Sequence, residues 1–127
     1  MRDVYEKIDG GVTAPAGFRA AGVACGIKAN GRPDLAVIAS DAPASAAAVF
    51  TTNLAQAAPI LVSRDHMQAS GARVSAIVVN SGCANACTGA DGMAHAGEMT
   101  ALTARALGVE PAAVLVASTG VIGVKLP

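Results

Sequence analysis

The stretch that decides the fold is RVSAIVVN, residues 73–80, which is apolar on both sides of an extended chain. Its apolar residues are Val74, Ala76 and Val78 on one side and Ile77 and Val79 on the other. A strand that is apolar on both faces is typical of the middle of a sheet with both faces covered. We therefore expect residues 73–80 to form a central strand.

A helix and a final strand are expected after this strand. Asp91 is placed to cap a helix that runs to about Leu107 and ends at Gly108, since glycine often ends helices in the left-handed conformation. The helix carries one stripe formed by His95, Met99, Leu102 and Ala106. Such a stripe is predicted to face the core. Pro111 then opens a last strand over residues 113–117.

The first half of the chain predicts a β-meander. Strands are expected over residues 17–28, 35–40, 46–52 and 58–63. Asn30-Gly31 lies between the first two, and Asn-Gly is a strong hairpin signal. Ser63 is expected to cap a short helix that stops at Gly71. A meander followed by β-α-β predicts an α/β layered sandwich with helices on a mixed sheet.

Length and composition indicate one domain with an unusually apolar character. The 127 residues suffice for one core, so we expect a single domain over residues 1–127, with residues 1–10 as a loose arm. Hydrophobic residues make up 53% of the chain, but charged residues only 14%, against roughly 25% in ordinary domains. Such a chain is expected to cover much of its surface with a partner.

Several functional classes are disfavoured. The formal net charge is +0 and aromatic residues are 2%, so the basic and stacking groups of a nucleic-acid site are missing. The polar N-terminus is not typical of a signal peptide. The uncharged stretches 74–90 and 112–124 contain Asn, Ser, Thr and Gly, unlike a membrane helix of about 20 apolar residues. We expect a cytoplasmic protein that binds neither nucleic acid nor membrane.

The cysteines and histidines offer no convincing site. Cys25, Cys83 and Cys87 give no even disulfide framework and are expected to be buried, inert thiols. Cys83, Cys87 and His95 lack a fourth zinc ligand, so no metal is predicted. No base for Cys87 is identifiable, and His66 and His95 are expected on the surface or in the helix rather than as catalysts.

The segment VNSGCANACTGADG, residues 79–92, is the first candidate for chemistry. Asn80 and Asn85 can hold neighbouring backbone in a turn, and Gly82 and Gly89 permit a positive φ. The helix that follows offers free N–H groups to an anion. The segment lacks the lysine and spacing of a P-loop. A packed turn and an anion site both remain open on these residues alone.

The second candidate is Ser118-Thr119-Gly120, which follows the last strand. An oxyanion hole needs preorganised donors aimed at a carbonyl oxygen that becomes negative in the transition state. A glycine N–H beside a threonine hydroxyl or amide fits that task. The same tripeptide also ends ordinary strands, so both interpretations stay open here.

Together, four segments closely resemble the N-terminal part of ornithine acetyltransferases, the glutamate N-acetyltransferases of arginine biosynthesis. They are GVTAPAGFRAAGVACGIK, AAAVFTTNLAQAAPILVSR, VVNSGCANACTG and STGVIGVKLP, in this order. The Asn-Ser-Gly-x-Ala-Asn-Ala and Ser-Thr-Gly-x-Ile-Gly motifs are the specific parts, although Cys83 stands where asparagine is more common. The resemblance implies a DmpA/ornithine acetyltransferase-like α+β fold that is incomplete without the rest of a precursor.

The resemblance also implies a mechanism. Family members cut themselves before a threonine, and this new N-terminal threonine of the β chain is the nucleophile, with its own amine as base. Acetyl passes from N-acetylornithine, or in some members acetyl-CoA, to glutamate, without a cofactor. Thr119 and Gly120 correspond to the oxyanion hole, and we expect structural support from Asn80, Gly82, Asn85 and Ser118. The implied assembly is an α2β2 heterotetramer.

The sequence departs from a complete enzyme in one respect. Cleavage is expected at an Ala-Thr junction, and the 127 residues contain no Ala-Thr dipeptide. We therefore expect the nucleophile and most substrate-binding residues beyond Pro127, and no activity from this chain alone. Two alternatives remain: a threonine-nucleophile amidase or peptidase of the same fold, and a non-catalytic anion-binding module.

Overall fold

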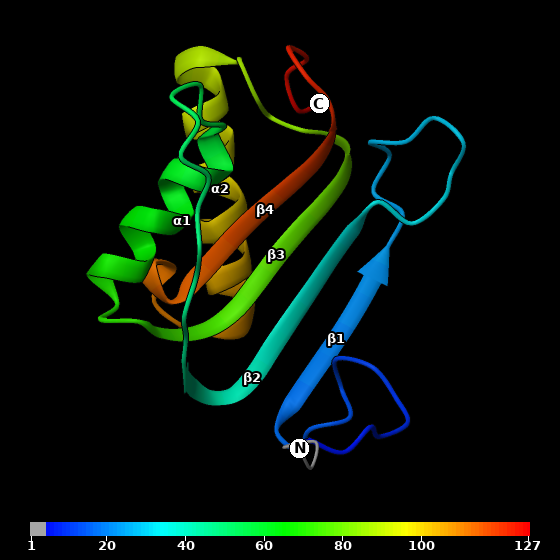
Figure 1. The fold of residues 1–127 in the computed structure, drawn as a ribbon. Helices are drawn as coiled ribbons and strands as arrows, with labels where there is room; N and C mark the ends of the chain where they lie inside the picture. Colours follow the sequence, from blue (N-terminus) through cyan, green and yellow to red (C-terminus); the bar gives the residue numbers. More distant parts are fainter. Residues whose placement is uncertain (1–4) are drawn as a thin grey trace.

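A computed structural model describes residues 5–127, which form a four-stranded mixed sheet with two α-helices (Figure 1). The elements are β1 (Phe18–Val23), β2 (Leu35–Ser45), α1 (Ala58–Ala69), β3 (Arg73–Cys83), α2 (Gly89–Leu107), a 3₁₀ turn (Pro111–Ala113) and β4 (Val114–Val121). The strand order is β1-β2-β3-β4. The first two pairings are antiparallel, and β3 pairs in parallel with β4 through the crossover helix α2. The predicted architecture of helices on a mixed sheet is confirmed.

The prediction of a central strand is confirmed by β3, which lies between β2 and β4. Val74, Ala76 and Val78 are buried in the core that the helices cover. The other face is not closed to the same degree, because Ile77 retains 37% of its accessible surface. The expectation that both faces are covered is therefore wrong for this face within residues 5–127.

The predicted strand over residues 58–63 is wrong, because these residues open α1. Pro59 occupies the first turn of the helix, where its missing N–H is not needed. The buried residues of α1 are Ala58, Pro59, Val62 and Ser63, which share one helical face. Ser63 is accordingly an interior residue of a longer helix rather than the cap of a short one.

Two side chains of α1 close the outer edge of β4. The Ser63 hydroxyl donates to the Val116 carbonyl (2.7 Å) and accepts from the Val116 N–H (2.9 Å). His66 Nδ1 lies 2.7 Å from the Val114 carbonyl oxygen. Exposed sheet edges present unpaired backbone groups, and here α1 satisfies those of Val114 and Val116. This tertiary requirement explains why the segment is helical.

The predicted strand over residues 46–52 is also wrong, because this segment is neither helix nor strand. Local hydrogen bonds replace a sheet ladder: the Thr51 hydroxyl accepts from the Asn53 N–H (3.1 Å), and the Asn53 side chain accepts from the Ala55 N–H (2.9 Å). Such local bonds compete with strand pairing. The segment instead passes along α1 (Figure 1).

The helix α2 confirms the predicted end but not the predicted start, and it confirms the predicted stripe only in part. Gly108 ends it in the left-handed conformation (φ 69°). It begins at Gly89 with Thr88 as the flanking residue, so Asp91 lies in the first turn instead of capping it. The buried residues are Gly92, Ala96, Thr100, Thr103 and Ala104. Of the predicted stripe, Met99 packs against the core, whereas Leu102 and Ala106 are exposed and line a groove against β1.

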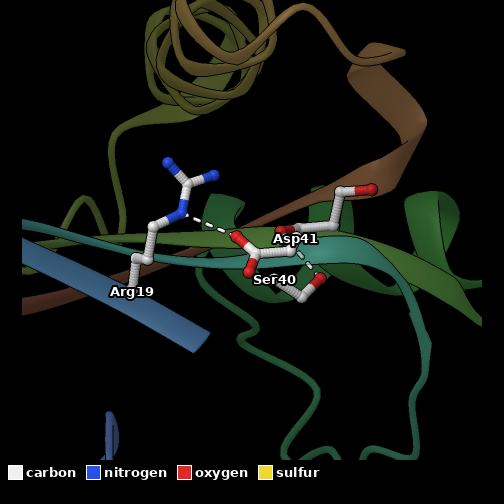
Figure 2. Close-up of polar contacts among 4 residues, drawn as sticks. Arg19, Ser40 and Asp41 are labelled. Carbon is white, nitrogen blue, oxygen red and sulfur yellow. Dashed lines mark hydrogen bonds and ion pairs between the residues drawn. The ribbon is translucent and has the colours of Figure 1, made fainter. Parts of the chain in front are cut away.

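The β1–β2 hairpin is confirmed, with a shorter first strand and a longer turn than predicted. Arg19 on β1 forms an exposed ion pair with Asp41 on β2 (Nε to Oδ1 2.8 Å), and the Ser40 hydroxyl donates to the Ser75 carbonyl (3.3 Å) (Figure 2). Residues 5–10 of the expected arm are exposed and contain no helix or strand, and residues 1–4 lie outside the described part.

Candidate active site

The two segments that the sequence marked for chemistry lie side by side as the ends of β3 and β4 (Figure 1). In the parallel ladder Asn80 is opposite Ser118, and Gly82 is opposite Gly120. The strand β4 extends to Val121, so Ser118, Thr119 and Gly120 belong to the strand rather than to a loop beyond residue 117. The carboxyl ends of adjacent parallel strands thus bring both motifs to one edge.

The contact between Gly82 and Gly120 is too close for any side chain. A Cβ at Gly120 would lie 2.3 Å from the Gly82 carbonyl carbon and 2.6 Å from the Cys83 nitrogen. Both glycines have positive φ angles, 116° and 135°, which side-chain-bearing residues rarely adopt. Glycine is therefore required at both positions to hold the two strand ends together.

Asn80 is fully buried beneath this contact and holds the end of β3. Its Nδ2 donates to the Cys83 carbonyl (2.8 Å). Its Oδ1 and the Ser118 hydroxyl are buried without a hydrogen-bond partner in residues 5–127. Unpaired buried polar groups carry a free-energy cost, so these two atoms mark a place where the site has unused hydrogen-bonding capacity.

Asn85 joins the end of β3 to the first turn of α2. It is fully buried, with a φ of 48°, and its Nδ2 donates to the Gly92 carbonyl (2.8 Å). The Thr88 hydroxyl donates to Asn85 Oδ1 (2.7 Å). A Cβ at Gly92 would lie 1.9 Å from the Thr88 oxygen. These bonds agree with the prediction that Asn85 holds the neighbouring backbone in a turn.

Thr119 and Gly120 are exposed in an open cleft of about 440 Å³ between β4 and residues 49–60. Its apolar walls include Phe50, Pro59, Ile60, Ile77, Leu115 and Ile122. No charged side chain in the described part of the chain lines it. The cleft thus offers an exposed threonine hydroxyl and a fixed glycine to a neutral group of modest size.

The first turn of α2 contains a negatively charged side chain, that of Asp91. Asp91 pairs with Lys125, and this contact lowers the pKa of Asp91 and raises the pKa of Lys125. A carboxylate in the first turn complements the positive end of the helix dipole. The first turn of α2 therefore already contains a carboxylate, and that carboxylate is paired with a lysine of the same chain.

The cysteines and histidines lie apart from the cleft. Cys83 is buried and donates to the Val124 carbonyl (3.1 Å), as expected of an inert thiol, but Cys25 and Cys87 are exposed, against the prediction. Burial could not be predicted for these two because each lies in a turn outside the strands. Within residues 5–127, no cluster of three or more metal-ligating side chains occurs. Neither histidine lines the cleft.

Sequence reasoning missed Asp34, which is only 3% exposed. Its carboxylate accepts from the Cys25 and Lys28 N–H groups at 2.7 and 2.8 Å. These amides lower the pKa of Asp34 from 3.8 to about 2. The one local signal was its place after Asn30-Gly31-Arg32-Pro33, where an acidic residue can bind turn backbone.

No helix in residues 5–127 has the length and apolar character needed to span a membrane. Solved structures share the fold, among them the following two. The arginine biosynthesis bifunctional protein argJ of Bacillus halodurans matches with a TM-score of 0.88 and 45% identity, over 93% of this chain and 61% of that one. Ornithine acetyltransferase of Mycobacterium tuberculosis, complexed with ornithine, matches with 0.86 and 47%, over 92% and 63%.

The curated relatives with similar sequences have the same protein name as the first of these solved structures. The arginine biosynthesis bifunctional protein ArgJ of Gloeobacter violaceus is 58% identical over 97% of this chain, and that of Symbiobacterium thermophilum is 53% identical over 96%. The chain spans about 30% of the length of each.

The chain thus has the α+β fold of these ArgJ and ornithine acetyltransferase structures. The model of the ArgJ family matches residues 19–127, and the chain belongs to this family.

Proposed function

We propose that this chain is the α-chain part of a self-cleaving threonine-nucleophile acetyltransferase. In this proposal the enzyme moves acetyl from N-acetylornithine to glutamate in arginine biosynthesis. Thr119 and Gly120 supply the oxyanion hole, and Asn80, Gly82, Asn85 and Ser118 support it. Two observations together carry the proposal. Thr119 and Gly120 are exposed in a cleft, and the backbone of Gly120 packs closely against that of Gly82.

The role of the oxyanion hole follows from the chemistry of acyl transfer. A threonine oxygen, supplied by the β chain, attacks the acetyl carbonyl carbon, and the carbonyl oxygen becomes negative. Thr119 and Gly120 donate hydrogen bonds to that oxygen. The intermediate collapses to an acyl-enzyme as the ornithine amine leaves with a proton, and the amine of glutamate then takes the acetyl group through a second intermediate of the same kind.

Preorganisation gives this arrangement its catalytic value. Donors that are already fixed in the ground state need no reorganisation when charge develops. The Gly82–Gly120 contact and the buried amide of Asn80 provide that rigidity. The apolar, uncharged walls of the cleft exclude competing ions and strengthen the hydrogen bonds to the oxyanion.

The remaining parts of the proposal concern the whole protein. We place the nucleophile on a β chain of the same precursor, in a cytoplasmic α2β2 heterotetramer that needs no cofactor, and we expect no turnover from residues 1–127 alone. The two relatives named above are called bifunctional. For this protein, acetyl-CoA is a candidate second acetyl donor, which an assay without N-acetylornithine would test.

The decisive experiment compares Thr119→Ala with Thr13→Ala in the full-length protein. Loss of an oxyanion donor lowers kcat by about 10²–10³. Thr13 is also exposed but lies ahead of β1, so its variant should match the wild type. Near-normal acetyl transfer by Thr119→Ala would overturn the assignment. Running the assay with and without glutamate separates a transferase from an amidase or peptidase, for which water suffices as acceptor.

A further inference from the structure

Asp34 is a buried carboxylate that the proposed catalytic steps do not use. It precedes β2 by one residue and ends the turn of the β1–β2 hairpin. Its two oxygens accept from the Cys25 N–H (2.7 Å) and the Lys28 N–H (2.8 Å). A buried charge needs such partners, and these bonds in turn fix the backbone of residues 25–28.

The backbone of Asp34 is tied to β3 at the same point. Its carbonyl accepts from the Ser81 N–H (2.8 Å), and its own N–H donates to the Val23 carbonyl (3.0 Å). One residue therefore joins the end of β1, the turn at residues 25–28 and the residue directly before Gly82.

The turn at residues 25–28 rests on Gly82. A Cβ at Gly82 would lie 2.9 Å from Ile27 Cγ2 and 3.1 Å from Lys28 Cγ. These side chains occupy the space on one side of Gly82, and Gly120 packs against its backbone. Gly82 is thus held between the turn and the strand that carries the oxyanion donors.

We propose that Asp34 is a positioning residue for the oxyanion segment: it holds residues 25–28 against Gly82 and thereby fixes the direction of Gly120. The inference rests on the proposed function, since its readout is acyl transfer. Asp34 does not line the cleft, so its carboxylate acts through Ile27, Lys28 and Gly82, and the bond of its backbone carbonyl to Ser81 remains in any side-chain variant. Misplacement of a catalytic donor by about 1 Å can cost about 10²-fold in rate, so small movements of Gly82 matter.

The test compares Asp34→Asn with Asp41→Asn in the full-length protein. Asn is nearly isosteric, but it has one acceptor oxygen for two N–H groups and no charge. We expect Asp34→Asn to lower kcat about tenfold or more, with KM changed less than about twofold, because only the transition state has the oxyanion. Asp41 is exposed and paired with Arg19 (Figure 2), so Asp41→Asn should leave both constants within about twofold of wild type.

A second variant covers the case in which Asp34→Asn does not fold. Ile27→Ala keeps the carboxylate and its hydrogen bonds and removes the Cγ2 contact with Gly82. It should also lower kcat, by about threefold or more, with KM unchanged. A folded Asp34→Asn or Ile27→Ala protein with wild-type kcat would overturn the inference. If Thr119→Ala itself retains full activity, the proposed function fails instead, and the two failures are distinguishable.

Discussion

Gly82 and Gly120 face each other across the parallel β3–β4 ladder at a distance that excludes even one methyl group. The pair joins the two motifs that carry the family resemblance. Both residues have positive φ angles, which favour glycine, and at Gly120 the backbone of Gly82 and Cys83 also leaves no room for a Cβ. The strand ends therefore meet in one fixed geometry.

Gly120→Ala should destabilise the protein by about 1–3 kcal/mol, since the methyl group must displace the backbone of Gly82 and Cys83. Acetyl transfer should fall in parallel. The matched control is Gly97→Ala in α2, where a Cβ has open space. Alanine there should stabilise the helix by up to about 1 kcal/mol. Urea unfolding of both variants measures the difference, and equal stability of the two would contradict the account of this contact.

Ser63→Ala should cost about 1–3 kcal/mol of unfolding free energy, because it leaves the buried N–H and carbonyl of Val116 without their partner. Ser70 provides the comparison. Its hydroxyl makes one long contact with the Met67 carbonyl (3.5 Å), so Ser70→Ala should change stability by less than about 0.5 kcal/mol. A thermal or urea midpoint for Ser63→Ala that equals that of Ser70→Ala would show that the β4 edge does not need α1.

Asn85→Ala should lower the free energy of unfolding by about 1–3 kcal/mol, because the buried Gly92 carbonyl and Thr88 hydroxyl lose their partners. The left-handed backbone at Asn85 adds to the cost, since alanine tolerates it less well. Asn30→Ala is the control: Asn30 is exposed and binds only the Arg32 N–H. Denaturant unfolding of the two variants should separate them clearly, and similar midpoints would contradict this role.

The stability of the protein should depend on Asp34 in acid. Its folded pKa of about 2 lies below the ordinary value of 3.8, so its stabilising contribution is complete above about pH 4 and is lost as the pH falls towards 2. Asp34→Asn should lack this component. Urea midpoints at pH 7 and pH 3 should fall more for the wild type and Asp41→Asn than for Asp34→Asn. An equal fall in all three would show that Asp34 is not the titrating group.

Local patterns in the sequence were sufficient to predict the central strand and the end of α2. The run at residues 73–80 is apolar on both faces and forms the central strand, and Gly108 ends α2 as expected. Both predictions depend on side chains and backbone angles within a few residues. The same is true of the Asn30-Gly31 hairpin.

The wrong predictions concern segments whose structure depends on contacts with residues far away in the sequence. Residues 58–63 are short and apolar, which fits a strand or a buried helix, and the need to cover the β4 edge through Ser63 favours the helix. Asp34 could not be predicted as a site residue because its burial depends on β3. The sequence did mark Gly82 and Gly120, but as members of separate loops, and only the parallel pairing brings them together.

Because α1 covers the start of β4, the two edges of the sheet differ in how readily they can pair with another strand. At the start of β4, Ser63 binds the Val116 N–H and carbonyl and His66 lies against the Val114 carbonyl, whereas all six residues of β1, at the opposite margin, are exposed. In the described sheet, a foreign strand can therefore pair more readily with β1 than with the start of β4. Arg19 on β1 and its ion-pair partner Asp41 on β2 place charges near this margin, and charged side chains at a sheet edge disfavour pairing between copies.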